Sequence, residues 1–428
     1  MMNTLLPELS SLSIYINILE DTAVKKLVGL LKLIRDESSN SEELIKAYSE
    51  VFAALLTNHR INLYQHIEDI TLQDENIFTL FCEKGKIHAD DPLAKQAAAE
   101  LGILQKLAEL SCTEIKNIMK DRFSGNTEIN RIIDNLPDWN TLCEREPNTQ
   151  WDADVGSRIL WHRKNGAGLF CKHVFFIYDG ASQTLSPVKN PDPITLDRLY
   201  LVDRQKEMAV KNTLIFLSGK TANNILFYGD RGTGKSSMVK ALANEFGEKG
   251  LRLVEVPKRY LSQIPKITSL LSDRGLKFIL FIDDLAFGNN EEEYTALKAV
   301  LEGGIEHRPD NILLYATTNR RHIVKEKFSD RRGFYSDNPD DEVRARDAIQ
   351  EKLSLSDRFG ITIVFSSPIK KEYLQIVHKM AEDRNLKIDP VLLEQKAMQW
   401  EMAYNGMSPR TARQFIDWLE GELDLSFQ

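Results

Sequence analysis

Hydrophobic residues recur at helical spacing throughout the first third of the chain. Leu27, Leu30, Leu31 and Ile34 fall at positions i, i+3, i+4 and i+7, the pattern of a helix that buries one face. The same pattern predicts helices over residues 23–35, 41–56, 92–110 and 113–121. We therefore expect residues 1–145 to form an all-helical domain.

The pattern changes between residues 146 and 190. A strand-like run, Val174–Tyr178, ends in the turn signal Asp179-Gly180, so this segment is predicted to be a linker with a small β element. Three tryptophans lie in or near it, at Trp139, Trp151 and Trp161. They could form a ligand platform, but packing between domains is the more ordinary use of such residues.

Short apolar runs alternate with helical segments from residue 191 to 366. The runs span residues 225–228, 251–256, 277–282, 312–316 and 361–365. Alternation of this kind predicts an α/β domain in which helices cover both faces of a parallel sheet. Residues 367–428 return to helical spacing and are predicted to form a separate helical segment.

Composition narrows the class of protein without changing this division. A chain of 428 residues with 42% hydrophobic and 28% charged residues is expected to fold into two or three soluble domains. The net charge of −8 argues against nucleic-acid binding by the whole surface. The four cysteines form no C-x-x-C pair, which excludes the usual zinc signature. We find neither a signal peptide nor a membrane span, so we expect a cytoplasmic protein.

A glycine-rich loop with the spacing G-x-x-x-x-G-K-S follows the predicted strand at 225–228. Backbone N–H groups of such a loop wrap the phosphates of a nucleotide, and the following helix N-terminus adds positive potential. Lys235 would reach the β- and γ-phosphates, and the Ser236 hydroxyl would bind Mg²⁺. The predicted nucleotide-binding residues are Gly229, Asp230, Arg231, Gly232, Thr233, Gly234, Lys235, Ser236, Ser237 and, further along the chain, Arg410.

Polar residues follow two of the later predicted strands. Asp283 and Asp284 end the run at 277–282, at the edge of a parallel sheet where ligands bind. Asp283 fits a carboxylate that holds Mg²⁺, and Asp284 fits the residue that polarises an attacking water molecule. Asn319 ends the next strand and could orient the same water. A polar strand end is otherwise only a turn, so these assignments depend on the phosphate loop upstream.

Two arginines are further candidates. Arg358 stands just before the run at 361–365, where it could project into the nucleotide site of a neighbouring subunit. A surface ion pair with Asp357 is the alternative, and it would contribute little. Arg410 and Arg413 lie three residues apart on the last predicted helix, so a guanidinium there could clamp phosphates from a lid.

In this order, the motifs resemble those of AAA-plus ATPases. Gly229–Ser236 is similar to the Walker A motif and Phe278–Asp284 to Walker B, while Asn319, Arg358 and Arg410 correspond to sensor 1, the arginine finger and sensor 2. More narrowly, the chain resembles the bacterial "domain of unknown function 815" ATPases in the runs 222–224, 301–304, 316–322 and 354–360.

This resemblance covers a little over half of the chain. It implies a P-loop NTPase sheet domain with a C-terminal helical lid, which bind ATP and Mg²⁺ and hydrolyse ATP to ADP and phosphate. It also implies a homo-oligomer, in which Lys235, Asp284, Asn319 and an adjacent subunit's Arg358 act together. Many members of the superfamily have Asp-Glu in Walker B, whereas this chain has Asp283-Asp284.

The sequence leaves the cellular task open among three hypotheses. The protein could remodel or load a macromolecular complex, with an unidentified protein partner recruited by the N-terminal helices. It could be a nucleic-acid loader, but its basic pairs, such as Lys258-Arg259, have acidic neighbours and no array of stacking aromatic residues. It could also be a scaffold whose partner affinity changes with bound nucleotide.

Overall fold

The computed structural model describes residues 2–57, 61–139, 150–285, 297–298, 301, 309–319, 358–404 and 406–426. The chain divides into two compact units, Met1–Lys172 and His173–Gln428, and each is described below by itself.

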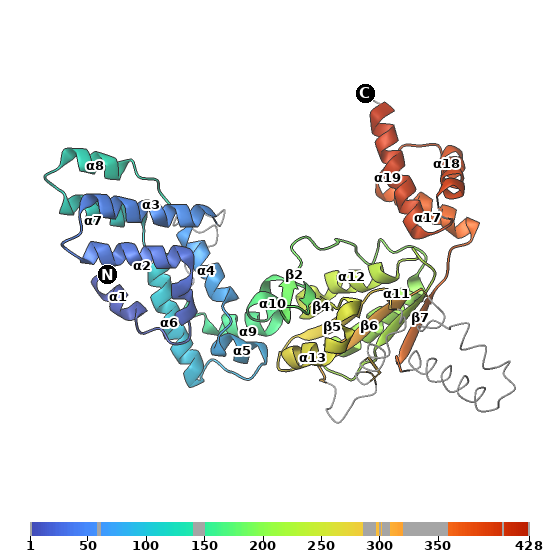
Figure 1. Cartoon of the computed structure of the whole chain (residues 1–428), viewed down its shortest axis with the longest axis horizontal. Helices are drawn as coiled ribbons and strands as arrows, with labels where there is room; N and C mark the ends of the chain where they lie inside the picture. The colour runs from blue at the N-terminus through green and yellow to red at the C-terminus, as the bar shows by residue number, and fades with distance from the viewer. Residues whose placement is uncertain are drawn as a thin grey trace. The chain divides into compact units, whose positions relative to one another are not determined.

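The N-terminal unit is helical (Figure 1). Its elements are α1 (Met2–Leu9), η1 (Ile16–Glu20), α2 (Thr22–Arg35), α3 (Ser41–Thr57), α4 (Leu63–Gln73), α5 (Ile77–Glu83), α6 (Pro92–Ala108), α7 (Cys112–Arg122), α8 (Thr127–Asp134), α9 (Val155–Asn165) and α10 (Leu169–Lys172). The four helices predicted from periodicity coincide with α2, α3, α6 and α7, with small differences at their ends. Leu27, Leu30 and Leu31 are buried, as the spacing predicts.

A buried carboxylate fixes the segment between α1 and η1. Glu100 on α6 accepts hydrogen bonds from the backbone N–H groups of Ser13, Ile14 and Tyr15 at 2.9–3.2 Å. Burial acts to raise the pKa of Glu100, but these bonds and one from the Gln96 side chain outweigh it and lower the pKa. Glu100 is therefore held as an anion that ties the N-terminal segment to α6.

Two tryptophans show that the N-terminal unit extends beyond the predicted boundary at residue 145. Trp139 stacks on Tyr48 with ring centroids 4.9 Å apart, and the Trp151 indole donates a 2.7 Å hydrogen bond to the Tyr64 hydroxyl. Both tryptophans are fully buried in this unit, so their predicted use between domains is wrong. Helices α9 and α10 also belong here, and the first half of the predicted linker is part of the N-terminal core.

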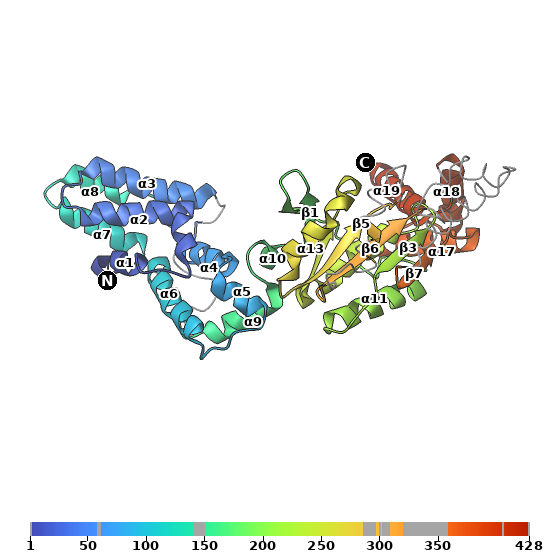
Figure 2. The same cartoon turned by 60° about the horizontal axis from the view of Figure 1, so that its bottom comes forward.

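The C-terminal unit contains a seven-stranded sheet within the described residues, in the order β2-β1-β4-β5-β6-β3-β7. The strands are β1 (Phe175–Asp179), β2 (Thr184–Pro187), β3 (Ile225–Gly229), β4 (Leu251–Glu255), β5 (Lys277–Ile282), β6 (Ile312–Thr318) and β7 (Ile361–Phe365). Figure 2 shows β5, β6, β3 and β7 side by side. Strand β1 pairs in parallel with β4, so the predicted small β element is part of the main sheet, and only β2 runs antiparallel.

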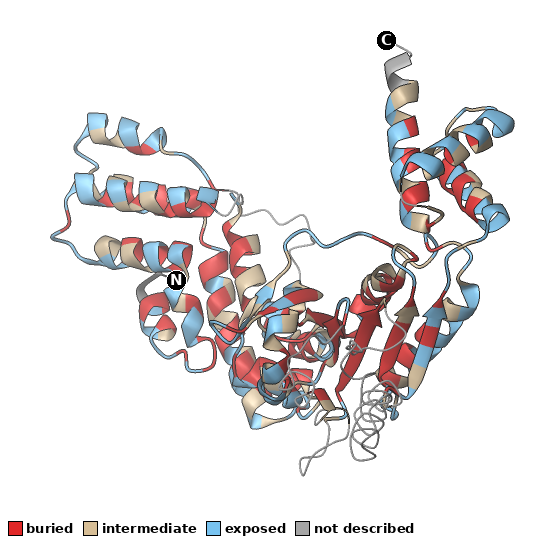
Figure 3. Cartoon of the chain, turned by 45° about the vertical axis from the view of Figure 1, so that its right-hand side comes forward, coloured by how far each residue is buried: buried red, intermediate tan, exposed pale blue. Residues whose placement is uncertain are grey.

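Helices cover the two faces of this sheet. Helix α12 (Lys235–Phe246) connects β3 to β4, and helix α13 (Ile264–Ser272) connects β4 to β5 in the opposite direction across the sheet. Because such crossovers are right-handed, the two helices lie on opposite faces of the sheet. Helix α11 (Asp203–Leu217) shares a buried apolar cluster with α12. The central strands are almost entirely buried (Figure 3), as their continuous apolar runs predict.

Among the described residues after β7, three helices have a hydrophobic core of their own. They are α17 (Lys370–Asp383), α18 (Pro390–Ala403) and α19 (Pro409–Ser426). The Asp389 side chain accepts hydrogen bonds from two N–H groups of the first turn of α18, as the Asp-Pro pair predicts. Short 3-10 turns, η2 (Gly247–Lys249) and η3 (Lys258–Gln263), flank β4.

The predicted fold class is therefore confirmed: an all-helical N-terminal unit precedes a mostly parallel P-loop sheet with helices after it. In the part of the chain that the structure describes, no helix is both long and hydrophobic enough to cross a bilayer.

Candidate functional site

The glycine-rich loop joins the end of β3 to the start of α12, and its backbone requires glycine. Gly229 has φ of 144°, and a Cβ on it would lie 1.8 Å from the carbonyl oxygen of Phe365. Gly232 has φ of 77° and lies against Ser408 and Arg410 at the start of α19. These two residues therefore let the loop pass close to both β7 and the C-terminal helices.

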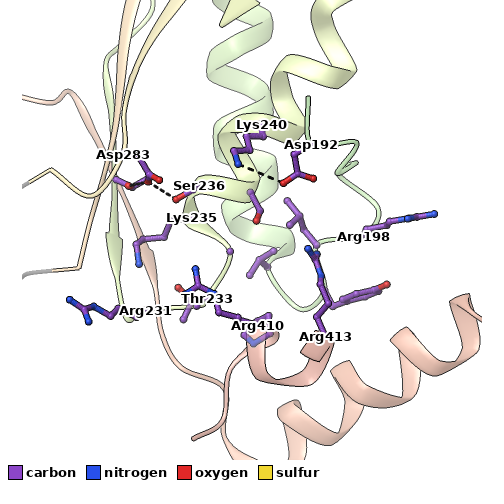
Figure 4. Close-up of a pocket in the computed structure, with 18 of the residues that line it drawn as sticks. Asp192, Arg198, Arg231, Thr233, Lys235, Ser236, Lys240, Asp283, Arg410 and Arg413 are labelled. Atoms are coloured by element: carbon purple, nitrogen blue, oxygen red, sulfur yellow. Dashed lines mark hydrogen bonds and ion pairs between the residues drawn. The ribbon is translucent and has the colours of Figure 1, made fainter. Parts of the chain in front are cut away.

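A cavity of about 560 Å³ opens beside this loop (Figure 4). The loop and α12 form one wall, the ends of β5 and β6 another, and a segment before α11 and the C-terminal helices a third. The lining residues are Asp192, Arg198, Leu199, Tyr200, Val202, Arg231, Gly232, Thr233, Gly234, Lys235, Ser236, Ser237, Lys240, Asp283, Asp284, Thr317, Asn319, Met380, Pro409, Arg410 and Arg413. Six are Lys or Arg and three are Asp, an excess of positive charge in a protein of net charge −8.

Lys235 is buried at the floor of the cavity. Its ammonium donates to the carbonyl oxygens of Gly229 (2.9 Å) and Asp230 (2.5 Å) and to Oδ1 of Asn319 (2.7 Å). Burial lowers the pKa of Lys235, partly offset by the nearby carboxylates. The lysine therefore has three oxygen partners in this structure, and they hold its charge at the loop.

Ser236 and Asp283 are in contact, as the sequence motifs predict. The Ser236 hydroxyl donates a 2.6 Å hydrogen bond to Oδ1 of Asp283, and the Thr317 hydroxyl donates to the same oxygen at 2.6 Å. A hydroxyl and a carboxylate side by side are oxygen ligands of the kind that Mg²⁺ takes when phosphates and water complete its shell. The described residues contain no cluster of three or more His, Cys, Asp or Glu side chains that could hold a metal ion by itself.

Asp284 is held on three sides. Its backbone, with φ of 52°, donates from N–H to the Thr317 hydroxyl at 2.7 Å. Its carboxylate accepts a 2.7 Å hydrogen bond from Asn319 Nδ2 and forms a 3.1 Å ion pair with Lys258. Asn319 thus bridges Lys235 and Asp284 through the two ends of one amide.

The other predicted residues divide into those that line the cavity and those that do not. Arg410 lines it from the start of α19, and its N–H donates to the Gly232 carbonyl oxygen at 3.2 Å. The Asp230 carboxylate instead accepts from the N–H and hydroxyl of Ser367, and these bonds lower its pKa. Arg358 precedes β7 and is not among the described residues that line the cavity.

The segment before α11 also lines the cavity, although no local motif in the sequence predicts it. Asp192 forms a 3.7 Å ion pair with Lys240 at the cavity, and Arg198 lies nearby (Figure 4). The Tyr200 hydroxyl donates to the Asp383 carboxylate at the end of α17, and burial together with this bond raises the pKa of Tyr200 to about 12. The sequence does contain a signal for Lys240 as a cavity residue, because it follows Ser236 by one helical turn on the same face of α12. The others have no local signal.

Several solved structures are similar to part of the chain. A point mutant of Thermotoga maritima RuvB has 19% identity, a TM-score of 0.38, and coverage of 55% of this chain and 67% of that one. The Thermotoga maritima RuvB Holliday junction branch migration motor has 17% identity, a TM-score of 0.33, and coverage of 53% and 72%. The Escherichia coli MS115-1 HORMA:CdnC:Trip13 complex has 14% identity, a TM-score of 0.33, and coverage of 52% and 89%.

The comparison with curated proteins finds no match. A family model described as "Protein of unknown function (DUF815)" matches residues 171–423, which is more than half of the chain. The match includes every described strand of the sheet, α17, α18 and most of α19, and it agrees with the family resemblance of the sequence motifs. The chain therefore belongs to the DUF815 family of proteins of unknown function.

Proposed function

We propose that this protein is an AAA-plus ATPase that binds Mg-ATP in the cavity beside the glycine-rich loop and hydrolyses it to ADP and phosphate. The observation that carries the proposal is the Asn319 amide, which contacts both Lys235 and Asp284 at 2.7 Å. It joins the proposed phosphate-binding and water-activating groups in one hydrogen-bonded set. The Ser236–Asp283 contact adds the proposed metal ligands beside them.

The loop and Lys235 bind the phosphates in this proposal. The α12 N-terminus begins at Lys235, and its cap, Gly234, makes no side-chain hydrogen bond to the first turn. The N–H groups of that turn are therefore suited to phosphate oxygens. Lys235 would exchange its contacts with loop carbonyl oxygens for contacts with the β- and γ-phosphates. Arg410 would reach the same phosphates from the C-terminal helices.

Ser236 and Asp283 would hold Mg²⁺. When bound, the ion would supply positive charge that neutralises the phosphates. Thr317 donates to the Asp283 oxygen that Ser236 also contacts, so it fixes the orientation of that carboxylate. Thr317 is therefore a positioning residue for the proposed metal ligand.

Asp284 would orient the attacking water and accept its proton as the bond between the γ-phosphorus and the leaving oxygen breaks. Asn319 aims that carboxylate through its hydrogen bond, and ADP and phosphate leave as the products. We propose that Arg358 completes the site of an adjacent copy in a homo-oligomer. Its position outside the cavity of its own chain is consistent with this role.

We propose further that hydrolysis serves to remodel or load a protein complex recruited by the N-terminal unit. Two other hypotheses remain alternatives: a loader of nucleic acid, and a scaffold that is switched by bound nucleotide with little turnover. The described cavity gives no preference between these tasks, so the experiment must distinguish them.

The test measures binding of a fluorescent ATP analogue and release of phosphate by the full chain, with Mg²⁺ or with EDTA, and with or without DNA. We expect Mg²⁺-dependent binding and turnover, and loss of both in Lys235→Ala. Lys277→Ala is the matched control, because Lys277 is a half-buried lysine that, like Lys235, donates to a backbone carbonyl (2.8 Å), at the opposite end of β5. Absence of nucleotide binding would refute the proposal. Tight binding without turnover would favour the scaffold, and stimulation by DNA would favour the loader.

A further inference from the structure

A second cavity of about 590 Å³ lies in the N-terminal unit, where α1 and η1 meet α2. Helix α1 lies beside α2 in both views (Figures 1 and 2). Five apolar side chains contribute to the lining, from Leu6, Pro7, Leu9, Leu19 and Val28. Lys25, Lys32 and Arg35 line it from α2, and we call this cavity the α1–α2 groove.

Gly29 lines the middle of this groove. It lies inside α2 with ordinary helical backbone, where glycine costs about 1 kcal/mol relative to alanine. A Cβ at this position would have nothing within 4 Å, so packing inside the unit does not require a glycine. Because Gly29 lines the groove, a large side chain at this position would project into it.

The charge of α2 is uniform. Four basic residues and no acidic residue occur within Thr22–Arg35, although the whole chain has a net charge of −8. Lys25 forms an exposed 2.8 Å ion pair with Glu20. Within the described part of the chain, the side chains of Lys32 and Arg35 have no ion-pair partner, and both are exposed. The groove therefore has an apolar floor and a positively charged rim.

The depth of the apolar floor limits what can bind there. Leu6 and Leu9 are 7% and 2% exposed, so they cannot insert into a bilayer. A ligand must instead bring its own apolar groups into the groove. A nucleic-acid backbone has no such groups, and Glu8 and Glu20 lie close to the floor and the rim. From Lys25 to Arg35, α2 extends about 15 Å, which is close to three helical turns.

We propose that the α1–α2 groove binds an acidic amphipathic helix of a partner protein. Leucine-like residues at helical spacing would enter the groove over Gly29, and Asp or Glu residues beside them would face Lys32 and Arg35. This is recognition of a helix by a groove, with charge complementarity that fixes its orientation. The proposal goes beyond the ATPase function and does not depend on it, since the groove lies wholly in the N-terminal unit.

The test is selection of peptides from a displayed random 14-residue library on the wild-type full chain, followed by measurement of their binding to Gly29→Trp. The indole of that variant would fill the groove, whereas Gly29→Ala leaves it open and is the matched control. We expect the selected peptides to carry apolar residues at i, i+3 or i+4 and an excess of Asp and Glu. They should bind Gly29→Ala like the wild type and Gly29→Trp at least ten times more weakly.

Charge reversal provides a second measurement that is independent of folding around Gly29. We expect the Lys32→Glu, Arg35→Glu double variant to weaken binding of the selected peptides at least tenfold, and added salt to weaken their binding to the wild type. Circular dichroism and nucleotide binding should match the wild type in every variant. Selected peptides that are basic, or that bind Gly29→Trp equally well, would overturn the proposal. So would binding only to phosphatidylserine vesicles, which would indicate a lipid surface.

Discussion

Replacement of Asp284 by asparagine separates the proposed chemistry from the fold. Asp284 has φ of 52°, a left-handed conformation that asparagine adopts as readily as aspartate. Its hydrogen bond to the Thr317 hydroxyl uses only the backbone N–H of Asp284 and survives the change. The substitution therefore removes one negative charge and leaves the backbone, the size of the side chain and the local hydrogen bond in place.

The expected loss of stability is small. The carboxylate forms an ion pair with Lys258, and the two side chains are 52% and 43% exposed. An exposed pair of this kind contributes about 0–1 kcal/mol, so the free energy of unfolding should fall by no more than that. The expected loss of turnover is much larger, since removal of a general base lowers the rate about 10²–10⁴-fold. Binding of ATP should change by less than about threefold, because Asp284 makes no proposed contact with the phosphates.

Three measurements on one preparation check these values: urea unfolding, affinity for a fluorescent ATP analogue, and phosphate release under saturating nucleotide. Asp134→Asn is the matched control, because Asp134 also forms an exposed ion pair with a lysine, at 2.8 Å from Lys120 in the N-terminal unit. We expect that control to lose a similar small stability and no turnover. If Asp284→Asn hydrolyses ATP within fivefold of the wild type, Asp284 does not activate the water and the proposed role is wrong.

Three further predictions concern other contacts. Glu100→Gln should speed hydrogen exchange of the Ser13, Ile14 and Tyr15 amides by at least tenfold, as measured by mass spectrometry. In the wild type, folding lowers the pKa of Glu100. The stability that its carboxylate contributes should therefore be complete above about pH 5 and be lost as pH falls through that lowered pKa. Unchanged exchange in the variant would contradict it. Lys258→Met should raise basal phosphate release by up to about fivefold, because it frees the Asp284 carboxylate from an exposed ion pair; lower release would show that Lys258 assists the reaction. Gly229→Ala should lower the free energy of unfolding by at least about 2 kcal/mol in a urea titration, because its Cβ would overlap a carbonyl oxygen of β7; an unchanged midpoint would refute the geometry.

The elements that the sequence predicts well are those with a local physical signal. The central strands β5 and β6 are nearly continuous apolar runs, and the predicted phosphate-binding loop is a fixed spacing of glycines that need conformations other residues avoid. The prediction that Asp283 and Asn319 lie close together rests on parallel strands ending at one edge of a sheet, and each residue directly follows its strand. These signals need no knowledge of how distant segments meet.

The elements that the sequence does not predict depend on distant contacts. Trp151 is a core residue of the N-terminal unit because Tyr64 lies 87 positions away in the sequence and accepts its indole N–H. Tyr200 reaches Asp383 across a separation of 183 positions. The sequence around each of these residues is equally typical of a surface loop. Their roles depend on contacts between segments that are far apart in the sequence.

The pairing of β1 with β4 has a practical consequence for dividing this protein into fragments. A fragment that begins at residue 191 would lack both β1 and β2 and would leave β4 as the sheet edge. The hydrogen bonds that β4 forms with Val174 and with β1 would be lost, and the apolar Leu253 and Val254 would lie on an unpaired strand. Exposed apolar edge strands promote aggregation. Expression of the C-terminal unit should therefore begin at residue 173, where a soluble fragment is expected, and a fragment from residue 191 should precipitate.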